Sequence, residues 1–132
     1  MKKLCATLFA LAATMAHAEW VKIDVKSSDQ IERFIDPNRI RQSGPMNTMR
    51  RVWELSNLPT RMPNTARSIK SYIEYDCKDR RIRTIEEAFF SQHFAQGEPL
   101  AAMNQATKLG DWRDMGKGGA DEMIFDRVCP SG

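Results

Sequence analysis

The sequence predicts an α+β fold: a small single domain whose antiparallel β-sheet is tied to a C-terminal α-helix by a disulfide. Three observations lead to this prediction. Apolar and polar residues alternate along segments 20–26 and 68–78, as in half-buried strands. Segment 121–129 instead repeats apolar residues four positions apart, as in a helix. One cysteine lies in the second strand segment and another ends the helical segment, so one bridge would join them.

The first 18 residues predict a secretory signal peptide, and residues 19–132 the remaining domain. Lys2 and Lys3 precede an apolar run, and Ala16-His17-Ala18 has the small residues that mark a cleavage site. The run is too short to span a bilayer, which takes about 20 apolar residues. We therefore expect an exported chain without a transmembrane segment, located in the periplasm or at the cell surface or secreted.

Export would change both the charge and the cysteine content of the chain. The sequence has 20 Lys and Arg against 17 Asp and Glu, and the leader removes two lysines, so 18 minus 17 leaves +1. A balance this close to neutral does not favour nucleic-acid binding. Cys5 lies at the start of the apolar run, whereas a lipid-attachment cysteine lies at its end, so no lipid anchor is predicted.

The two other cysteines, Cys77 and Cys129, would then meet an oxidising compartment. A redox pair usually has the C-x-x-C spacing, and a zinc site needs more Cys or His ligands than His93 alone would add. We favour a structural disulfide. It would close a loop of 53 residues, counting both ends, which the chain-entropy model values at about 4 kcal/mol.

Alternation predicts five strands, separated by turns rich in residues that favour chain reversal. Ile82 and Ile85 lie three residues apart, which breaks the two-residue period and predicts a bulge in the last strand. The expected strands are 20–26, 31–35, 49–55, 68–78 and 82–92, with turns or loops at 27–29, 36–38, 43–45, 59–65 and 78–80.

The strand at 68–78 has two distinct faces. Its more apolar face would point to the core and includes Cys77, which suits a bridge to a packed element. The core face carries Ile69, Ser71, Ile73, Tyr75 and Cys77, and the opposite face carries Lys70, Tyr72, Glu74, Asp76 and Lys78.

The C-terminal part of the chain is less regular. Residues 97–99 read as a break, 100–108 have no clear period, and 110–119 read as a glycine-rich loop around Trp112. The helix follows: acidic residues open segment 121–129 and Arg127 lies near its end, which suits the helix dipole.

Several short motifs together resemble the surface-adhesin protein E-like family of bacterial envelope proteins. They are Trp20-Val21-Lys22, Ile35-Asp36-Pro37 with Ile40-Arg41, Arg51-Val52-Trp53, Arg67-Ser68-Ile69-Lys70, Glu74-Tyr75-Asp76-Cys77-Lys78 with Arg80, Arg81 and Arg83, then Trp112 and Cys129. The resemblance implies a small antiparallel sheet, one helix, a Cys77–Cys129 disulfide and a non-enzymatic envelope protein named for adhesion to host matrix proteins. Surface display in the family often uses a lipid anchor, and no lipobox is visible in this sequence.

A basic cluster formed by Lys78, Arg80, Arg81 and Arg83 is the first candidate for partner binding. It could bind an acidic partner such as a sulfated glycan, lipopolysaccharide or an acidic protein surface. Alternatively it is a solvated hairpin tip that protects strand edges, neutralised by acidic residues nearby. Those residues are Asp76, Asp79, Glu86 and Glu87.

The adjacent Phe89 and Phe90 are the second candidate. Neighbours on a strand point to opposite faces, so one of them could be exposed at a partner or dimer interface, while the alternative is core packing on both faces. His93 could instead ligate haem iron with a methionine, although no C-x-x-C-H motif is present.

We predict no catalytic residues, no metal site and no cofactor. One histidine outside the leader and no nucleophile-elbow motif leave no basis for a hydrolytic triad. The sequence therefore favours a non-catalytic envelope protein that binds an extracellular-matrix protein or an acidic envelope component, with a homodimer through an unpaired edge strand as a further option. The alternative is a periplasmic protein that binds haem or a lipid between sheet and helix.

Overall fold

The computed structural model describes residues 18–101 and 109–130. The predicted signal peptide lies outside the described residues except for Ala18, as does most of the ambiguous segment 100–108. Within the described ranges, no helix has the length and apolar character needed to cross a membrane.

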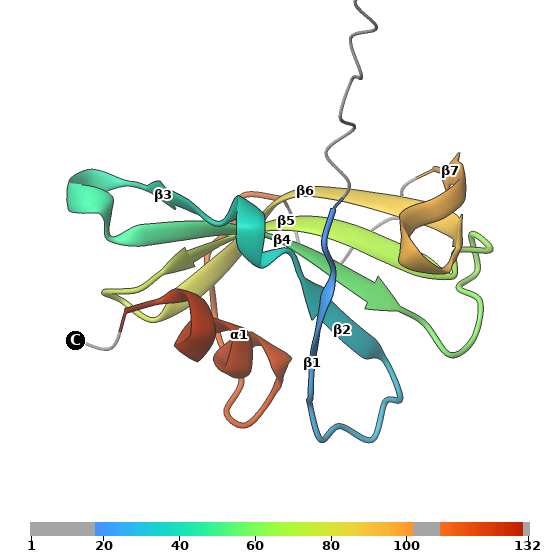
Figure 1. The fold of residues 1–132 in the computed structure, drawn as a ribbon, viewed down its shortest axis with the longest axis horizontal. Coiled ribbons are helices and arrows are strands. Elements are labelled where there is room, and N and C mark those ends of the chain that lie inside the picture. Colours follow the sequence, from blue (N-terminus) through green and yellow to red (C-terminus); the bar gives the residue numbers. More distant parts are fainter. Residues whose placement is uncertain (1–17, 102–108, 131–132) are drawn as a thin grey trace, which may run out of the picture.

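The described chain folds into one antiparallel sheet with a helix packed against it (Figure 1). The strand order is β1-β2-β4-β5-β6-β7, with β3 added to β4 and β8 added to β6. The strands are β1 (Val21–Ile23), β2 (Glu32–Ile35), β3 (Arg41–Ser43), β4 (Met49–Asn57), β5 (Ser68–Asp76), β6 (Arg81–Gln92), β7 (Gln96–Leu100) and β8 (Arg113–Asp114). Helix α1 spans Ala120–Val128, and short 3-10 turns occupy Pro37–Arg39 (η1), Pro45–Asn47 (η2) and His93–Ala95 (η3).

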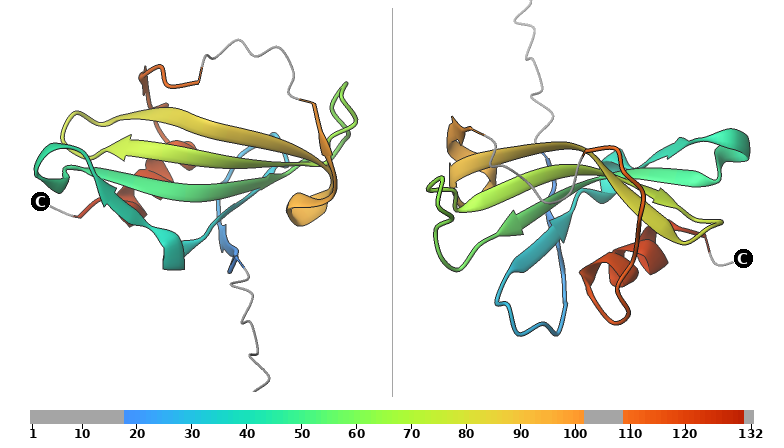
Figure 2. Two further views of the ribbon diagram at one scale, coloured as in Figure 1. Left: turned by 90° about the horizontal axis from the view of Figure 1, so that it is seen from above. Right: turned by 180° about the vertical axis from the view of Figure 1, so that it is seen from behind.

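The sheet has an inner face, which packs against α1, and an outer face on the opposite side. Figures 1 and 2 show α1, β1 and β2 on the same side of the sheet formed by β4, β5 and β6. Strand residues and residues of the α1 segment pack together between the sheet and the helix, so the inner face carries the main apolar packing. The core residues are Ile23, Ile35, Val52, Ile73, Tyr75, Ile82, Ile124, Phe125, Val128 and Cys129.

The predicted disulfide and helix are confirmed. The bridge joins Cys77, just beyond β5, to Cys129, just beyond α1, with 5.5 Å between the Cα atoms. Ile124, Phe125 and Val128 are buried on one side of the helix, as the four-residue spacing predicts. The α+β fold predicted from the sequence is therefore correct.

The five predicted strands are present, with changes at their ends. The first is shorter than 20–26, and the third extends two residues beyond Leu55. The predicted bulge is also present: the β5–β6 register shifts between Tyr72 and Ile73, which pair with Glu86 and Thr84, so Ile85 is the extra residue. The break in alternation located the bulge because one additional residue moves every following side chain to the other face of the sheet.

Three short strands were not expected. Residues 97–99 read as a break but belong to β7, and the predicted loop 110–119 contains β8. β3 consists of polar residues, and β7 includes Pro99 at the sheet's edge. Edge strands accept polar residues and proline because one side of their backbone needs no ladder partner, so no apolar period marks them.

Candidate binding face

The outer face of the sheet is the candidate functional surface, because α1 leaves it uncovered. Seen from above in Figure 2, β4, β5 and β6 lie in front of α1. Cross-strand pairing places Trp53 opposite Tyr72, and Arg51 between β3 residue Arg41 and Glu74, along this face. Its side chains are charged and aromatic, whereas those of the inner face are mainly apolar.

A buried carboxylate organises the centre of the outer face. The side chain of Glu74 is 1% exposed and accepts hydrogen bonds from Arg51 Nε at 2.6 Å and Arg83 Nε at 2.8 Å. Ser43 Oγ donates a further hydrogen bond at 2.8 Å. Burial alone would raise the pKa of Glu74, but the hydrogen bonds from Arg51, Ser43 and Arg83 outweigh it and hold that pKa below its usual value.

Asp76 is a second buried carboxylate with several hydrogen-bond donors, at the hairpin end of β5. Its carboxylate accepts a hydrogen bond from Arg81 Nε at 3.0 Å and from the backbone N–H groups of Lys78 and Asp79 at 3.2 and 3.1 Å. Burial opposes ionisation here too, yet the backbone donors and Arg81 lower the pKa of Asp76. This carboxylate therefore fixes the turn between β5 and β6.

These acids pair with two of the four residues of the basic cluster predicted from the sequence. Arg81 and Arg83 pair with Asp76 and Glu74, and both guanidinium groups lie over Trp112, at 4.6 and 4.5 Å from the ring centroid. Arg80 lies 4.5 Å from the centroid of Phe125, and its guanidinium is 3.9 Å from Glu122. The three arginines are thus engaged within the fold.

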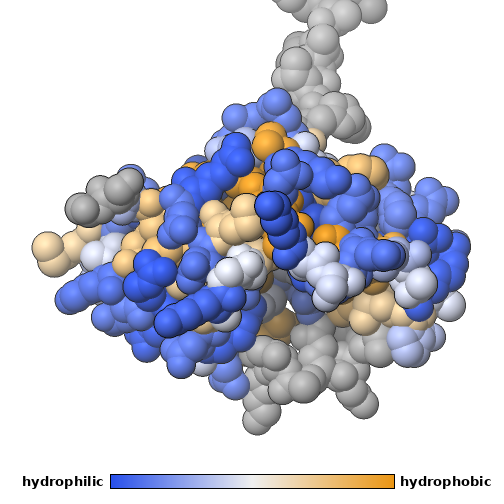
Figure 3. Space-filling model, turned by 90° about the horizontal axis from the view of Figure 1, so that it is seen from below, coloured by the Kyte–Doolittle hydropathy of each residue, from blue (hydrophilic) through white to orange (hydrophobic). Residues whose placement is uncertain are grey.

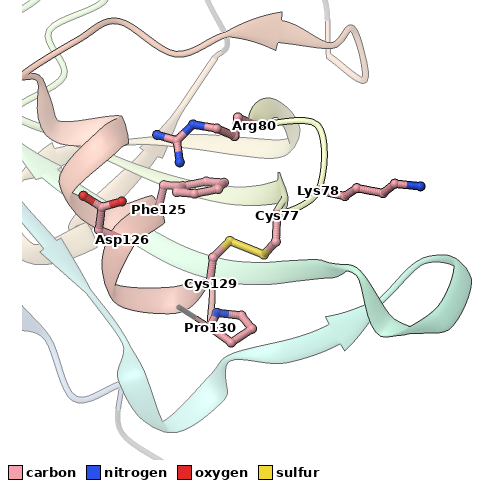
Figure 4. A pocket seen from close by; sticks show the side chains of 7 residues that line it. All are labelled: Cys77, Lys78, Arg80, Phe125, Asp126, Cys129 and Pro130. Atoms are coloured by element: carbon pink, nitrogen blue, oxygen red, sulfur yellow. A yellow bond between two sulfur atoms is a disulfide. The ribbon is translucent and has the colours of Figure 1, made fainter. Parts of the chain in front are cut away.

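Lys78 is the member of the basic cluster with no ion pair to a described residue. A pocket of about 460 Å³ lies beside the disulfide, lined by Cys77, Lys78, Arg80, Phe125, Asp126, Cys129 and Pro130. Figure 4 shows Arg80 reaching across Phe125, while Lys78 points away from the disulfide. Partner binding by this cluster stays a prediction.

The two adjacent phenylalanines have different environments. Phe89 is 3% exposed and pairs with Ile69 and Leu100 in the sheet, so it belongs to the interior. Phe90 is half-buried and pairs with Ser68 and Pro99. Phe89 is therefore a core residue, whereas Phe90 is half-buried, and partner binding by either phenylalanine stays a prediction.

An aromatic cluster on the outer face was not singled out from the sequence. The rings of Trp53 and Tyr72 stack with centroids 4.6 Å apart and planes inclined by 23°. The Lys70 ammonium lies 4.4 Å from the Trp53 centroid, a cation–π distance. Strand alternation already places Lys70 and Tyr72 on one face, but only the β4–β5 register brings Trp53 beside them.

The aromatic cluster continues into a pocket at the start of β1, here called the aromatic pocket. It has a volume of about 390 Å³ and is lined by Ala18, Trp20, Lys70, Phe94, Ala95 and Gln96. Ala18 belongs to the predicted leader, so the other five residues would form the lining in the exported chain. Phe94 is 45% exposed and its ring meets Phe34 edge-on at 5.2 Å. No sequence motif marks Trp20 and Phe94 as neighbours, since 74 positions separate them and only the fold joins them.

Glu54 is an ionisable group on the inner face that the sequence did not single out. It accepts a hydrogen bond from the Tyr75 hydroxyl. Burial raises the pKa of Glu54 to about 7; the hydrogen bond from Tyr75 lowers it, Asp121 raises it, and Arg33 and Arg113 lower it. The folded protein therefore holds a proton on Glu54 more tightly than the unfolded chain does.

This pKa predicts a pH-dependent stability. Because the folded pKa exceeds the unfolded value, Glu54 favours folding most below pH 4.5, and this contribution falls as the pH rises toward 7. We expect the free energy of unfolding of Glu54→Gln, relative to that of the wild type, to be about 1–2 kcal/mol higher at pH 8 than at pH 5. This difference is smaller than the full pKa shift implies because the side chain is partly exposed. Urea unfolding at both pH values measures this difference. The exposed Glu98→Gln is the control, and equal effects of Glu54→Gln at both pH values would refute the prediction.

His93 is poorly placed to bind haem. Its Nε2 lies 2.9 Å from the Leu58 carbonyl and 3.1 Å from Arg67 Nη2, so this nitrogen already faces protein groups. Among residues 18–101 and 109–130, no group of three or more His, Cys, Asp or Glu side chains is arranged to hold a metal ion. Apolar core side chains from the sheet and the helix meet where the alternative hypothesis placed a ligand.

The face seen in Figure 3, on which α1 and the β1–β2 loop lie, is mainly hydrophilic with small apolar areas. An extended apolar surface is the usual mark of an interaction site, and this view shows none of that kind. The outer face, with its aromatic and charged side chains, is the more promising of the two.

Comparisons with known proteins now identify the family. Residues 20–130 match the family described as Surface-adhesin protein E. The chain belongs to the surface-adhesin protein E family. Family membership supports the prediction of a surface protein and fits a non-enzymatic role, and it agrees with the resemblance expected from the short motifs.

Solved structures show that the fold is shared as well. Haemophilus influenzae protein E aligns with a TM-score of 0.66 at 16% identity, covering 88% of this chain and 87% of that one. Its second crystal form aligns with a TM-score of 0.66 at 17% identity, covering 94% and 96%. No curated protein sequence matches the chain. At these identities the structural likeness concerns the fold alone.

Proposed function

We propose that this member of the surface-adhesin protein E family is exported and binds a macromolecular partner, either a host matrix protein or an envelope component, without catalysis. The match to the family over residues 20–130 is the observation that carries the proposal. The signal-like sequence of residues 1–18 supports export, and the final location is the periplasm or the cell surface.

The outer face is the surface that we assign to the partner. Trp53 and Tyr72 are half-buried and stacked, and the Arg39 guanidinium lies 5.9 Å from the centroid of the Trp53 ring. Tryptophan, tyrosine and arginine are the residues that most often dominate the free energy of protein binding, because they combine large contact area with directed polar groups. The Glu74 and Asp76 ion pairs hold several of these side chains in place before a partner arrives.

The location is tested by protease treatment of intact bacteria that express the full chain, followed by detection with an antibody against residues 19–132. We expect cleavage of the domain on intact cells. Full protection together with release in the periplasmic fraction would contradict surface display and leave an envelope component as the partner. A periplasmic marker protein, which must stay uncleaved, controls for lysis.

Binding through the outer face is tested with Tyr72→Ala against immobilised matrix proteins and purified envelope components. Loss of one large aromatic contact at the centre of an interface typically costs about 2 kcal/mol or more, so we expect binding to weaken by at least about tenfold. The control is Met123→Ala, which removes a 38% exposed side chain on α1. Equal binding by Tyr72→Ala and the wild type would rule out this part of the face.

A further inference from the structure

The aromatic pocket has the composition of a ligand site. Its lining provides two aromatic rings, from Trp20 and Phe94, one ammonium group, from Lys70, and one amide, from Gln96. The lining contains no carboxylate. With Ala18 of the leader in place, the volume is about 390 Å³, within the range of roughly 300–1,000 Å³ that is usual for sites binding small molecules. The ring, ammonium and amide groups all come from residues that remain after the leader is removed.

Lys70 differs electrostatically from the arginines of the basic cluster. Arg81 and Arg83 each have a carboxylate within 3.0 Å, whereas Lys70 has no ion pair with a described residue. Its ammonium is instead held over the Trp53 ring, which orients it without neutralising its charge. The aromatic pocket is therefore complementary to an anion.

The turn that places Phe94 in the pocket wall is held by hydrogen bonds within the fold. Phe94 and Ala95 both have left-handed backbone angles, with φ of 61° and 55°, which is uncommon for residues other than glycine. Two buried side chains hold this turn: Asn57 Oδ1 accepts the Phe94 N–H at 2.8 Å, and Ser68 Oγ accepts the Ala95 N–H at 3.0 Å. The fold thus maintains a strained turn that leaves the Phe94 ring 45% exposed, which is common where a residue serves binding.

We propose that the aromatic pocket binds a pyranose sugar that carries a carboxylate, such as a uronic or sialic acid unit of a glycan. The inference rests on the proposed function and specifies the ligand chemistry at one end of the outer face. The C–H face of a pyranose packs on aromatic rings, its hydroxyl groups suit an amide such as that of Gln96, and its carboxylate pairs with the Lys70 ammonium. A neutral sugar would leave the ammonium unpaired.

The test is a titration followed by tryptophan fluorescence, with the protein expressed from its full sequence and purified as the host processes it. The probes are sialyllactose, a hyaluronan tetrasaccharide and, as the neutral reference, lactose. We expect at least one acidic probe to bind about tenfold more tightly than lactose, since a hydrogen bond to a charged group contributes about 1.5–3 kcal/mol. Comparing the two acidic probes distinguishes a sialic from a uronic acid.

Matched variants assign the effect to the pocket. Lys70→Gln should reduce binding of the acidic probe to the level of lactose, and Phe94→Ala should weaken both, whereas Lys78→Gln should change neither. A circular dichroism spectrum like that of the wild type shows that each variant is folded. The proposal is overturned if lactose binds as well as both acidic probes, or if Lys70→Gln and Lys78→Gln have the same effect.

The outcome is separable from that of the proposed function. If Tyr72→Ala abolishes binding of a macromolecule while no acidic sugar binds, the outer face is a protein-binding surface and the glycan inference fails. If the acidic sugar binds and no macromolecule does, the aromatic pocket stands and the broader proposal fails.

Discussion

Replacing both bridged cysteines in the Cys77→Ser, Cys129→Ser double variant lowers the free energy of unfolding by about 4 kcal/mol, by the chain-entropy model. The bridge spans 52 positions and joins the chain just after β5 to the chain just after α1. Without it the unfolded chain gains conformational freedom, while α1 keeps the core contacts of Ile124, Phe125 and Val128 alone. Urea unfolding of the double variant and of the oxidised wild type measures the difference.

Chemical reduction provides the control for this experiment. The wild type treated with a thiol reductant should unfold at the same urea concentration as the double variant, since both lack the same bridge. A loss below about 1 kcal/mol in both would show that core packing alone holds α1 on the sheet, contrary to the prediction. A loss in the double variant only would point to disturbed packing by serine rather than to the bridge.

Glu74→Ala should lower the free energy of unfolding by about 2–4 kcal/mol, the second largest effect that we expect. Glu74 is buried and forms ion pairs with both Arg51 and Arg83, whose side chains are 39% and 31% exposed. Removing the carboxylate leaves two guanidinium groups close together without a counter-charge. Their partial exposure lets them turn toward water, which keeps the loss below that of a fully buried pair.

A second variant separates charge from packing at this site. Glu74→Gln keeps the side chain's volume, so a loss close to that of Glu74→Ala would identify charge as the cause. The exposed Glu98→Ala on β7 should change stability by no more than about 0.5 kcal/mol. If Glu74→Ala also stays within that limit, the carboxylate does not hold the outer face together.

Two of the predicted binding residues, Arg81 and Arg83, also have structural partners within the fold, for a clear physical reason. In the sequence, Arg81 and Arg83 read as a local cluster of positive charge. In the folded chain, strand pairing places Glu74 opposite Arg83 and Asp76 opposite Arg81, and the β8 region brings Trp112 over both arginines. Opposite charges on directly paired strand positions stabilise the sheet, so these residues are engaged before any partner is present.

Local periodicity alone determined the long strands, the bulge at Ile85, the C-terminal helix and, with the small number of cysteines, the disulfide. These features depend on the period of side-chain facing, which each segment carries in its own residues. The short edge strands β3, β7 and β8 have no such period, because a polar or proline-containing edge needs none.

The tertiary structure decided which side chains remain available for binding. Trp20, Lys70 and Phe94 come from β1's start, β5 and η3, and only the sheet's register and the turn held by Asn57 and Ser68 bring them to one pocket. The sequence by itself determined the long strands and the helix, and its short motifs indicated the family. The distribution of free and neutralised charge depended on pairing between distant segments, because an ion pair forms wherever the fold places opposite charges within a few ångströms, whatever their separation along the chain.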